Sequence, residues 1–344
     1  MRILLLPISF IYSIILTIRH KLYDWHLLKT KRYRQPVICV GNLSLGGTGK
    51  TPHTEYLIQL LRDTYAVCVV SRGYGRRTRG FQLATISCSS DTIGDEPMQL
   101  YSKFSDLQVA VDENRCEAIE LMLSQDIPPQ VFVLDDAYQH RRITAGMNLL
   151  LTRYDRLYTE DFLIPTGTLR DVKGASKRAD IVMVTQCPET LFSGDGNAID
   201  DEIDQLRHRL RLLEKQHLFL STIRYEAMRP VTHAARTLLN DEGLPSNTSC
   251  LCFTGIAHPE PLEKHLHTYY ATVQTIRFND HHRYSERDLQ RIKNQFESLG
   301  SGLRILVTTE KDLARLTNSP YFCWFESLPL FVAPVSVIIH KEEE

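Results

Sequence analysis

A glycine-rich loop that ends in a lysine and a threonine is the strongest chemical feature of the sequence. It follows the apolar run Val37–Val40 and reads GNLSLGGTGKT from Gly41 to Thr51. Such glycines let backbone N–H groups converge on phosphate oxygens, with Lys50 reaching the β- and γ-phosphates and the Thr51 hydroxyl holding Mg²⁺. In the pattern G-x-x-x-x-G-K-[ST] the first glycine falls at Ser44, so another feature must form the opening bend. The residues predicted to contact a nucleotide here are Ser44, Gly46, Gly47, Thr48, Gly49, Lys50 and Thr51.

Two adjacent aspartates follow another apolar run. Asp135 and Asp136 come directly after Val131–Leu134. Carboxylates are costly in a core, but they are expected beside Mg²⁺ at the carboxyl end of a strand. We therefore predict that both aspartates hold Mg²⁺ with Thr51, the alternative being an aspartate-rich turn. The loop continues with two polar groups able to touch nucleotide or substrate, Gln139 and His140.

Transfer of a phosphoryl group to a hydroxyl needs a carboxylate or a histidine near the γ-phosphate. Asp95 and Glu96 open a predicted helix, and the pattern alone favours helix capping by Asp95, with Glu96 at the positive end of the helix dipole. Asp280 is followed by His281 and His282, which could orient a base, bind a metal or cap the next helix. A zinc site is discounted, because two adjacent histidines cannot easily face one metal from a regular element.

A basic loop follows the apolar run Val67–Val70. It carries four arginines and two glycines between Arg72 and Arg79. Arginines at the carboxyl end of a strand suit an anionic ligand. Arg72 is the stronger candidate, whereas a solvated surface loop is the simpler reading of Arg77 and Arg79.

Short β-branched runs separated by helical patterns indicate the fold class. Such alternation is typical of a mostly parallel sheet covered by helices on both faces. We predict an α/β protein with a P-loop NTPase-like, mostly parallel sheet domain and a second, smaller α/β domain. The polar stretch Ser193–Asp201 is expected to be a loop, and the segment after Tyr321 to add one late strand. The predicted strands are Val37–Val40, Val67–Val70, Val131–Leu134, Leu149–Leu151 and Ile181–Val184 in the first domain, and Cys250–Thr254, Thr272–Phe278 and Arg304–Thr308 in the second.

The N-terminal segment is apolar from Ile3 to Ile18 and is followed by several basic residues. As a helix it would rise about 24 Å, short of a hydrocarbon core of about 30 Å. Its polar residues recur with helical spacing and leave a wide apolar face, as in helices that lie in the membrane interface. The alternative is a helix packed on the body of the protein.

Composition narrows the possible partners. Lys+Arg number 40 against 41 Asp+Glu, a formal charge of -1, so the overall charge does not indicate a nucleic-acid binder. The 8 cysteines are scattered, without zinc spacing or the density of a disulfide framework. This usage favours a reduced, cytosolic compartment.

These motifs, in this order, resemble the tetraacyldisaccharide 4′-kinases, the lipid A 4′-kinases of Gram-negative bacteria. The resemblance extends from the N-terminal helix to about residue 315. The family transfers the γ-phosphoryl group of ATP to the 4′-hydroxyl of a tetraacylated glucosamine disaccharide 1-phosphate in lipid A biosynthesis. The segments that carry the resemblance are Gly41–Ser44, Gly49–Pro52, Ser71–Gly75, Gly94–Pro97, Leu134–Asp136, Gln139–His140, Asp280–His281 and Thr309–Asp312.

The resemblance implies ATP and Mg²⁺ as cofactors and gives roles to individual residues. Asp95 would be the catalytic base, assisted by His281 and with Lys50 in the catalytic set, which replaces capping as the expected role of Asp95. Because His282 is adjacent, the histidine partner is ambiguous by one residue. Tyr74 and Gln139 are expected at the nucleotide. The residues expected to bind substrate are Asn42, Arg72, Glu96, His140 and Arg170, the last in a Pro-x-Gly-x-x-Arg loop.

Three parts are expected along the chain. Residues 1–34 would form a membrane-associated helix, 35–225 the nucleotide-binding kinase domain, and 226–344 a smaller domain that closes over the active site. Closure would bring His281 to Asp95 and exclude water. The resemblance also implies a peripheral or monotopic protein at the cytosolic face of the inner membrane, acting on a lipid-linked disaccharide. No nucleic-acid partner and no oligomer are predicted.

Two other functions fit part of the pattern. One is a P-loop GTPase-type switch or metallochaperone, although guanine specificity usually uses Asn/Thr-Lys-x-Asp and Thr309–Asp312 has its lysine one place late. The other is a different small-molecule ATP-dependent kinase or ligase, for which the N-terminal helix would be unnecessary.

Overall fold

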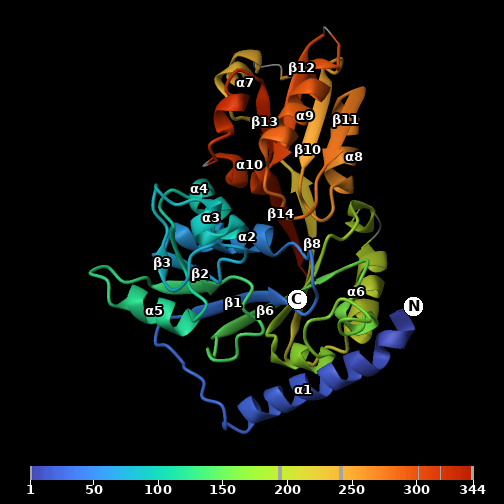
Figure 1. Ribbon diagram of the computed structural model, residues 1–344. Helices are drawn as coiled ribbons and strands as arrows, with labels where there is room; N and C mark the ends of the chain where they lie inside the picture. Colours follow the sequence, from blue (N-terminus) through green and yellow to red (C-terminus); the bar gives the residue numbers. More distant parts are fainter. Residues whose placement is uncertain (1, 193–195, 240–242, 301, 318, 342–344) are drawn as a thin grey trace.

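Two β-sheets organise the chain in a computed structural model that describes residues 2–192, 196–239, 243–300, 302–317 and 319–341 (Figure 1). The strands of the larger sheet are β1 (Val37–Asn42), β2 (Val67–Ser71), β3 (Gln82–Leu83), β4 (Gln108–Val111), β5 (Val131–Leu134), β6 (Met147–Arg153), β7 (Ile181–Thr185), β8 (His217–Tyr225) and β14 (Val335–Lys341). Their order is β14-β8-β7-β6-β1-β5-β2-β4-β3, and neighbours are parallel except at the two edges, β14 and β3. The β-branched runs thus form the predicted, mostly parallel sheet.

Helices cover both faces of the larger sheet, as its buried apolar strands require. The helices are α2 (Lys50–Arg62), α3 (Ser90–Ile93), α4 (Asp95–Lys103), α5 (Arg115–Leu123) and α6 (Gly196–Leu210). Ile58 of α2 and Leu100 of α4 pack on one face of the sheet. Met122 of α5 and Leu206 of α6 pack on the other. Short 3₁₀ turns are η1 (Arg2–Leu5), η2 (Tyr158–Glu160), η3 (Lys173–Arg178), η4 (Glu189–Phe192) and η5 (Phe322–Phe325).

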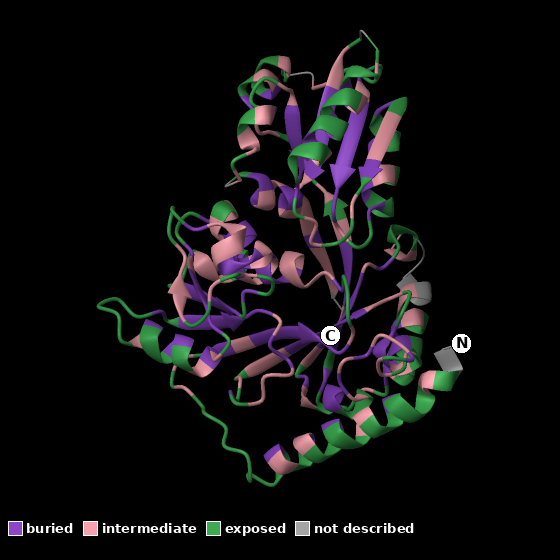
Figure 2. Ribbon diagram, in the orientation of Figure 1, coloured by how far each residue is buried: buried purple, intermediate pink, exposed green. Residues whose placement is uncertain are grey.

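The smaller sheet lies above the larger one in Figure 1. Its strands are β9 (Arg229–Pro230), β10 (Ser249–Thr254), β11 (Thr272–Arg277), β12 (Arg304–Thr309) and β13 (Leu330–Ala333), in the order β11-β10-β12-β13-β9. Its helices are α7 (His233–Leu238), α8 (Glu260–Tyr269), α9 (Glu286–Glu297) and α10 (Glu310–Thr317). Helix α10 faces α3 and α4 of the larger part, and the buried strands of both sheets form separate cores (Figure 2).

The C-terminal strand departs from the predicted division of the chain. Residues 226–344 were expected in one smaller domain, but β14 pairs with β8 in the larger sheet, with Val335 opposite Tyr225. The apolar residues after Pro334 pair along the edge of β8, which would otherwise present unpaired backbone groups. The segment after Tyr321 therefore adds two strands rather than one, and two adjacent strands connect the parts.

The loop expected at Ser193–Asp201 is wrong where the structure describes it. Residues 193–195 lie outside the described residues, and α6 begins at Gly196. Ile199, Ile203 and Leu206 recur with helical spacing and pack toward the sheet. Intervening aspartates hide this periodicity in the sequence.

Helix α1 (Leu6–Asp24) lies along the larger part and contacts it through its polar side. The Ser9 hydroxyl donates to the Leu163 carbonyl at 2.9 Å. His20 Nε2 lies 2.6 Å from a buried Asp171 oxygen, and Arg141 donates to Asp24 at 2.6 Å. The polar residues that mark an amphipathic helix in the sequence therefore attach α1 to the body.

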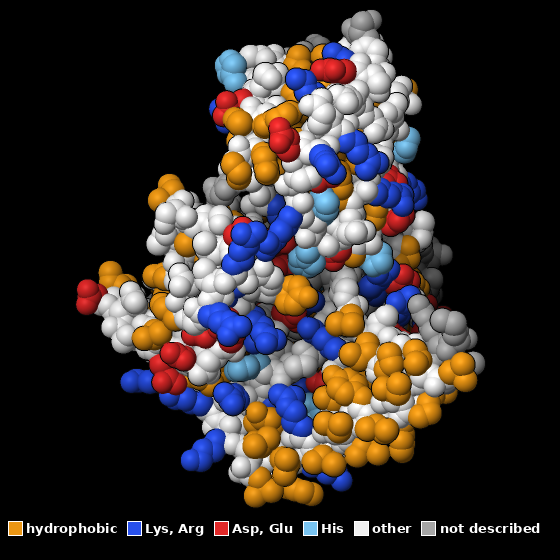
Figure 3. Space-filling view, in the orientation of Figure 1, with side chains coloured by type: hydrophobic (Ala, Val, Ile, Leu, Met, Phe, Trp, Pro, Cys, Tyr) orange, Lys and Arg blue, Asp and Glu red, His pale blue; other side chains and the backbone are white. Residues whose placement is uncertain are grey.

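The apolar side of α1 faces away from the body. Figure 3 shows hydrophobic side chains gathered over this helix. The exposed ones are Leu6, Ile8, Phe10, Ile11, Ile14, Ile15 and Ile18. None of the helices in the described ranges is long and apolar enough to cross a membrane.

Candidate active site

The phosphate loop connects β1 to α2 at the carboxyl edge of the larger sheet. Helix α2 begins at Lys50, directly after Gly49, whose φ of 77° favours glycine. Inside the loop, the Asn42 side chain donates to Thr48 Oγ1 at 2.7 Å, and Thr185 Oγ1 of β7 donates to the Thr48 carbonyl at 3.0 Å. These hydrogen bonds fix the loop to β1 and β7. The backbone N–H groups of the loop lie at the start of α2, and helix N-termini bind anions.

Ser44 occupies the position at which the pattern has its first glycine. It forms an isolated antiparallel bridge with Leu169, and the N–H of Leu45 donates to the Thr168 carbonyl at 2.7 Å. Pairing with this neighbouring segment therefore sets the opening of the loop, which explains why no glycine is needed there.

Asp136, the second aspartate after β5, is surrounded by cations. Arg170 Nη1 donates to Asp136 Oδ2 at 2.9 Å, and Lys50 Nζ lies 3.9 Å from Asp136 Oδ1. Burial acts to raise the pKa of Asp136, but the hydrogen bonds from Arg170 and the charge of Lys50 outweigh it and hold that pKa below its usual value.

Asp135 is buried and chemically different from its neighbour. Burial, followed by the charges of Asp136 and Glu96, raises the pKa of Asp135 to about 6. The Thr54 hydroxyl donates to it at 3.4 Å. The nearby cations do not fully offset the negative charges around Asp135. Its carboxylate is therefore a suitable oxygen ligand for a metal cation.

The donor set at this edge fits Mg²⁺ shared with a nucleotide. No group of three His, Cys, Asp or Glu residues that could hold a metal occurs among the described residues. Thr51, Asp135 and Asp136 supply only oxygens, and Mg²⁺ commonly uses one or two carboxylates together with phosphate oxygens and water.

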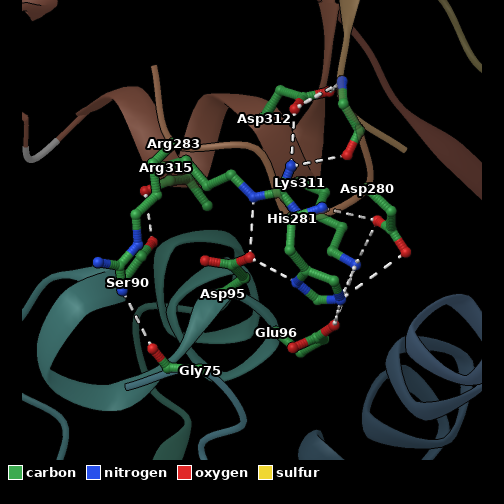
Figure 4. A network of polar contacts seen from close by, with 12 residues as sticks. Gly75, Ser90, Asp95, Glu96, Asp280, His281, Arg283, Lys311, Asp312 and Arg315 are labelled. Atoms are coloured by element: carbon green, nitrogen blue, oxygen red, sulfur yellow. Dashed lines mark hydrogen bonds and ion pairs between the residues drawn. The ribbon is translucent and has the colours of Figure 1, made fainter. Parts of the chain in front are cut away.

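Asp95 and His281 meet across the two parts of the molecule (Figure 4). His281 Nδ1 lies 2.9 Å from Asp95 Oδ2, although the residues are 186 positions apart. Gly94 occupies the N-cap of α4, so the helix-capping role that the pattern favoured for Asp95 is wrong. His282 lies 3.0 Å from Asp288 instead, and the structure thereby selects His281 as the partner of Asp95.

Several charged groups surround this pair. Lys311 Nζ lies 3.1 Å from Glu96 and 3.3 Å from His281 Nε2. Arg315 Nε donates to Asp95 Oδ2 at 2.8 Å. Burial acts to raise the pKa of Asp95, but the hydrogen bonds from His281 and Arg315 prevail and lower it. The Asp95 carboxylate is therefore ionised at neutral pH.

An arginine cluster lies beside the aspartate pair. Burial, followed by the charges of Arg115 and Arg142, lowers the pKa of His140 to about 4, so this imidazole is neutral. Arg115 is itself largely buried, and its Nε has no hydrogen-bond partner among the described residues. Arg72 contributes to the same positive field. This concentration of positive charge suits an anionic group of a ligand.

The remaining predicted site residues divide between these regions. The Gln139 side chain donates to the Asn42 carbonyl at 2.8 Å, beside the phosphate loop. Tyr74 was expected at the nucleotide, but its exposed ring lies 5.7 Å from the ring of His281, beside the Asp95–His281 pair. Glu96 follows Asp95 on α4 and pairs with Lys311.

The sequence patterns did not predict two candidate site residues, Arg115 and Arg315. Arg115 follows β4, a short strand that was not recognised in the run Gln108–Val111. Arg315 lies one turn after Lys311 and Asp312 on α10, where residues three and four apart share a helix face. That spacing was the available signal for Arg315.

Comparison with known proteins identifies the family. A family model described as tetraacyldisaccharide-1-P 4′-kinase matches residues 1–344. The chain belongs to this family. Among its relatives, the tetraacyldisaccharide 4′-kinase of Bacteroides thetaiotaomicron is 43% identical over 99% of this chain and 90% of its own length. The tetraacyldisaccharide 4′-kinase of Parabacteroides distasonis is 43% identical over 99% and 92%.

A solved structure has a similar fold. It is described as the "apo" form of LpxK from Aquifex aeolicus in complex with ATP. The match covers 99% of this chain and 96% of that chain, with a TM-score of 0.73 and 28% sequence identity. The resemblance to tetraacyldisaccharide 4′-kinases is thereby confirmed. The GTPase-type switch or metallochaperone and the different small-molecule ATP-dependent kinase or ligase are no longer supported.

Proposed function

We propose that this protein transfers the γ-phosphoryl group of ATP to the 4′-hydroxyl of a tetraacylated disaccharide 1-phosphate, with Asp95 and His281 acting on that hydroxyl. Membership of the tetraacyldisaccharide 4′-kinase family supports the reaction, the ATP donor and the lipid-linked acceptor. The observation that carries the assignment of the site is the 2.9 Å contact between His281 Nδ1 and Asp95 Oδ2.

In this proposal the Asp95 carboxylate orients the sugar hydroxyl and takes its proton. The sugar oxygen forms a bond to the γ-phosphorus while the bond to the β–γ bridging oxygen breaks, and ADP leaves with that electron pair. Since phosphoryl transfer depends mainly on positioning and charge, an ionised carboxylate fixed by His281 meets the main requirement.

The phosphate loop holds the donor. Backbone N–H groups at the start of α2 and the Lys50 ammonium bind phosphate oxygens, and Lys50 exchanges its 3.9 Å contact with Asp136 for them. Mg²⁺, held by Thr51, Asp135 and Asp136, would neutralise charge on the β- and γ-phosphates when bound. Gln139 would border the nucleotide, whereas Tyr74 lies beside the Asp95–His281 pair.

The arginine cluster is the proposed site of an anionic group of the acceptor. Arg72 and Arg115 lie near a neutral His140, and Arg170 contacts both Asn42 and Asp136. A phosphate on the disaccharide would add negative charge beside these arginines, of which Arg115 has a buried Nε without a hydrogen-bond partner among the described residues.

Helix α1 is the proposed membrane contact. Its outward isoleucines would enter the interface of the cytosolic face of the inner membrane, while Ser9 and His20 keep the helix attached to the body. The acyl chains of the acceptor would then stay in the bilayer as the sugar enters the site. The smaller part, which brings His281 to Asp95, would exclude water from the site.

Transfer of ³²P from [γ-³²P]ATP to a tetraacylated disaccharide 1-phosphate in detergent micelles tests this function. The native protein is expected to label the lipid phase in a Mg²⁺-dependent manner, and Lys50→Met to lose at least about 100-fold of that activity. An unlabelled lipid phase from a folded, ATP-binding protein would overturn the acceptor assignment. Label supplied equally well by GTP would overturn ATP as the specific donor.

A further inference from the structure

The two oxygens of the Asp95 carboxylate have different environments. Oδ2 accepts from His281 Nδ1 at 2.9 Å and from Arg315 Nε at 2.8 Å (Figure 4). Oδ1 has no hydrogen-bond or ion-pair partner among the described residues, and the Asp95 side chain is 16% exposed. Only Oδ1 is therefore free to meet an incoming hydroxyl.

Arg315 has a buried side chain that makes several hydrogen bonds in this position. Its side chain is only 5% exposed. Its Nη1 donates to the Gly255 carbonyl and to Asp312 Oδ1, each at 2.9 Å. Asp312 is itself fully buried and accepts from Tyr284 OH at 2.9 Å and Thr254 Oγ1 at 2.7 Å. The guanidinium thus has one orientation relative to Asp95.

A general attraction between the two parts does not account for this arrangement. Arg283 also bridges them, at 3.1 Å from Asp91 and 3.1 Å from the Gly75 carbonyl, but its side chain is 55% exposed. Exposed pairs of this kind contribute little. Arg315 differs because it is buried and contacts the proposed base.

We propose that Arg315 is a positioning residue of the phosphoryl transfer, which holds Asp95 through Oδ2 and presents Oδ1 to the sugar hydroxyl. The proton of that hydroxyl passes to Oδ1 as the sugar oxygen bonds to the γ-phosphorus and ADP leaves. This inference rests on the proposed role of Asp95 as base.

The charges around Asp95 determine the pH behaviour. The cations come from the smaller part: Arg315 and Lys311 of α10, and His281 when protonated. The anions that face them are Glu96 on the same helix as Asp95, Asp280 beside His281, and Asp312 behind Arg315. Arg315 lowers the pKa of Asp95, so its removal raises that pKa. Since the base acts ionised, the acidic limb of activity must then move to higher pH.

The test is the pH profile of kcat/KM for Arg315→Gln, with Arg283→Gln as the matched interface control. For Arg315→Gln we expect kcat to fall about 10-fold or more at pH 7 and the acidic limb to move up by about one pH unit. The KM for ATP should change less than about twofold. Arg283→Gln should leave the acidic limb in place.

Arg315→Lys keeps the result interpretable if the glutamine variant does not fold. The lysine restores the charge and hence the position of the acidic limb, but one ammonium cannot serve Asp95, Gly255 and Asp312 in the geometry of a guanidinium. A lowered kcat with the native limb is expected. The proposal would be overturned if the acidic limb of the pH profile stayed in place in Arg315→Gln, or if Arg315→Lys kept the native kcat.

Asp95→Asn, measured in parallel, separates this inference from the function on which it rests. If Asp95→Asn keeps native activity, the proposed base is wrong whatever Arg315 does. If Asp95→Asn is inactive and Arg315→Gln has a native profile, only the role of Arg315 is overturned.

Discussion

Lys103 Nζ lies 3.0 Å from Glu310 Oε2, an ion pair that joins the C-terminal end of α4 to the start of α10. The same ammonium lies 2.6 Å from a buried Glu55 oxygen on α2. Helix α4, which carries Asp95 at its first position, is therefore attached to the smaller part at both ends. The phosphate-loop helix shares this network.

Replacing Lys103 with methionine should destabilise the protein by about 3 kcal/mol at pH 8, because the buried Glu55 loses its cation and Glu310 keeps only Arg229. Burial, opposed by Lys103, already raises the pKa of Glu55 to about 7 from 4.5. Without the lysine it rises further, the folded state binds the proton more readily, and stability falls as pH increases from about 5 to 8. The deficit in urea unfolding should thus be smaller at pH 5.5 than at pH 8. Lys293→Met, at an exposed position of α9, is the control, and an equal deficit at both pH values would contradict the prediction.

The two adjacent histidines give a matched pair of variants for the catalytic role. His281→Asn should lower kcat by about 10²- to 10⁴-fold, because Asp95 loses its partner at 2.9 Å. His282→Asn removes the contact with Asp288 and the ring contacts with Phe278 and Tyr284, but none with Asp95, and should retain most of the activity. ATP binding, followed with a fluorescent analogue, should be unchanged in both. The reverse order of activities would make His282 the functional residue.

The ring of His53, on the phosphate-loop helix α2, makes one hydrogen bond to the start of that helix and one to β8. Nδ1 lies 2.7 Å from the Gly49 carbonyl oxygen, and Nε2 lies 2.8 Å from the Ser221 hydroxyl oxygen. Burial lowers the pKa of His53 to about 4, so the folded state resists protonation. Its stabilising contribution is complete above about pH 6.5 and is lost as the pH falls toward 4, by up to about 3 kcal/mol.

Replacing His53 with glutamine should therefore flatten the pH dependence of stability between pH 6.5 and 4. Urea unfolding at several pH values measures this slope. His208→Gln, at an exposed position of α6, should leave the slope as it is in the native protein. An unchanged slope in His53→Gln would show that His53 is not the group that resists protonation.

The outward face of α1 should determine membrane binding. Replacing Ile14 and Ile18 with serine removes apolar area from that face and should reduce flotation with anionic phospholipid vesicles by about tenfold or more. Activity on acceptor dispersed in detergent micelles should persist. Replacing Ile86 and Ile127, two exposed isoleucines outside α1, is the matched control. Equal flotation of both double variants would contradict the membrane role of α1.

Local patterns were sufficient for the main strands and the phosphate loop. Val37–Val40 is directly followed by the glycine-rich loop, and Val131–Leu134 by two aspartates. In both places an apolar run predicted a strand, and the polar residues after it predicted a binding site at the end of that strand. The Asp95–His281 pair was different, because local pattern favoured a helix cap and only the family resemblance indicated a base. The contact between Asp95 and His281 is created by the packing of α4 against the smaller part. The spacing of residues along the chain does not predict that packing.

The features that escaped prediction depend on contacts between distant segments. Strand β14 pairs with β8 across more than a hundred residues, and Arg315 reaches Asp95 over 220 positions. The polar residues of α1 indicated an amphipathic helix correctly, but not that Ser9 and His20 would bind the body of the protein. In each case the residue type was visible in the local sequence, but the distant residue that it contacts was not.

The role of Asp95 is tested most directly by kcat of Asp95→Asn with ATP and the tetraacylated disaccharide 1-phosphate, measured alongside nucleotide affinity. The asparagine keeps the shape of the side chain but cannot take the hydroxyl proton. We expect kcat to fall by about 10²- to 10⁴-fold while the affinity for ATP and the thermal unfolding temperature stay close to the native values. A kcat within about threefold of the native value would contradict the assignment of Asp95 as the base.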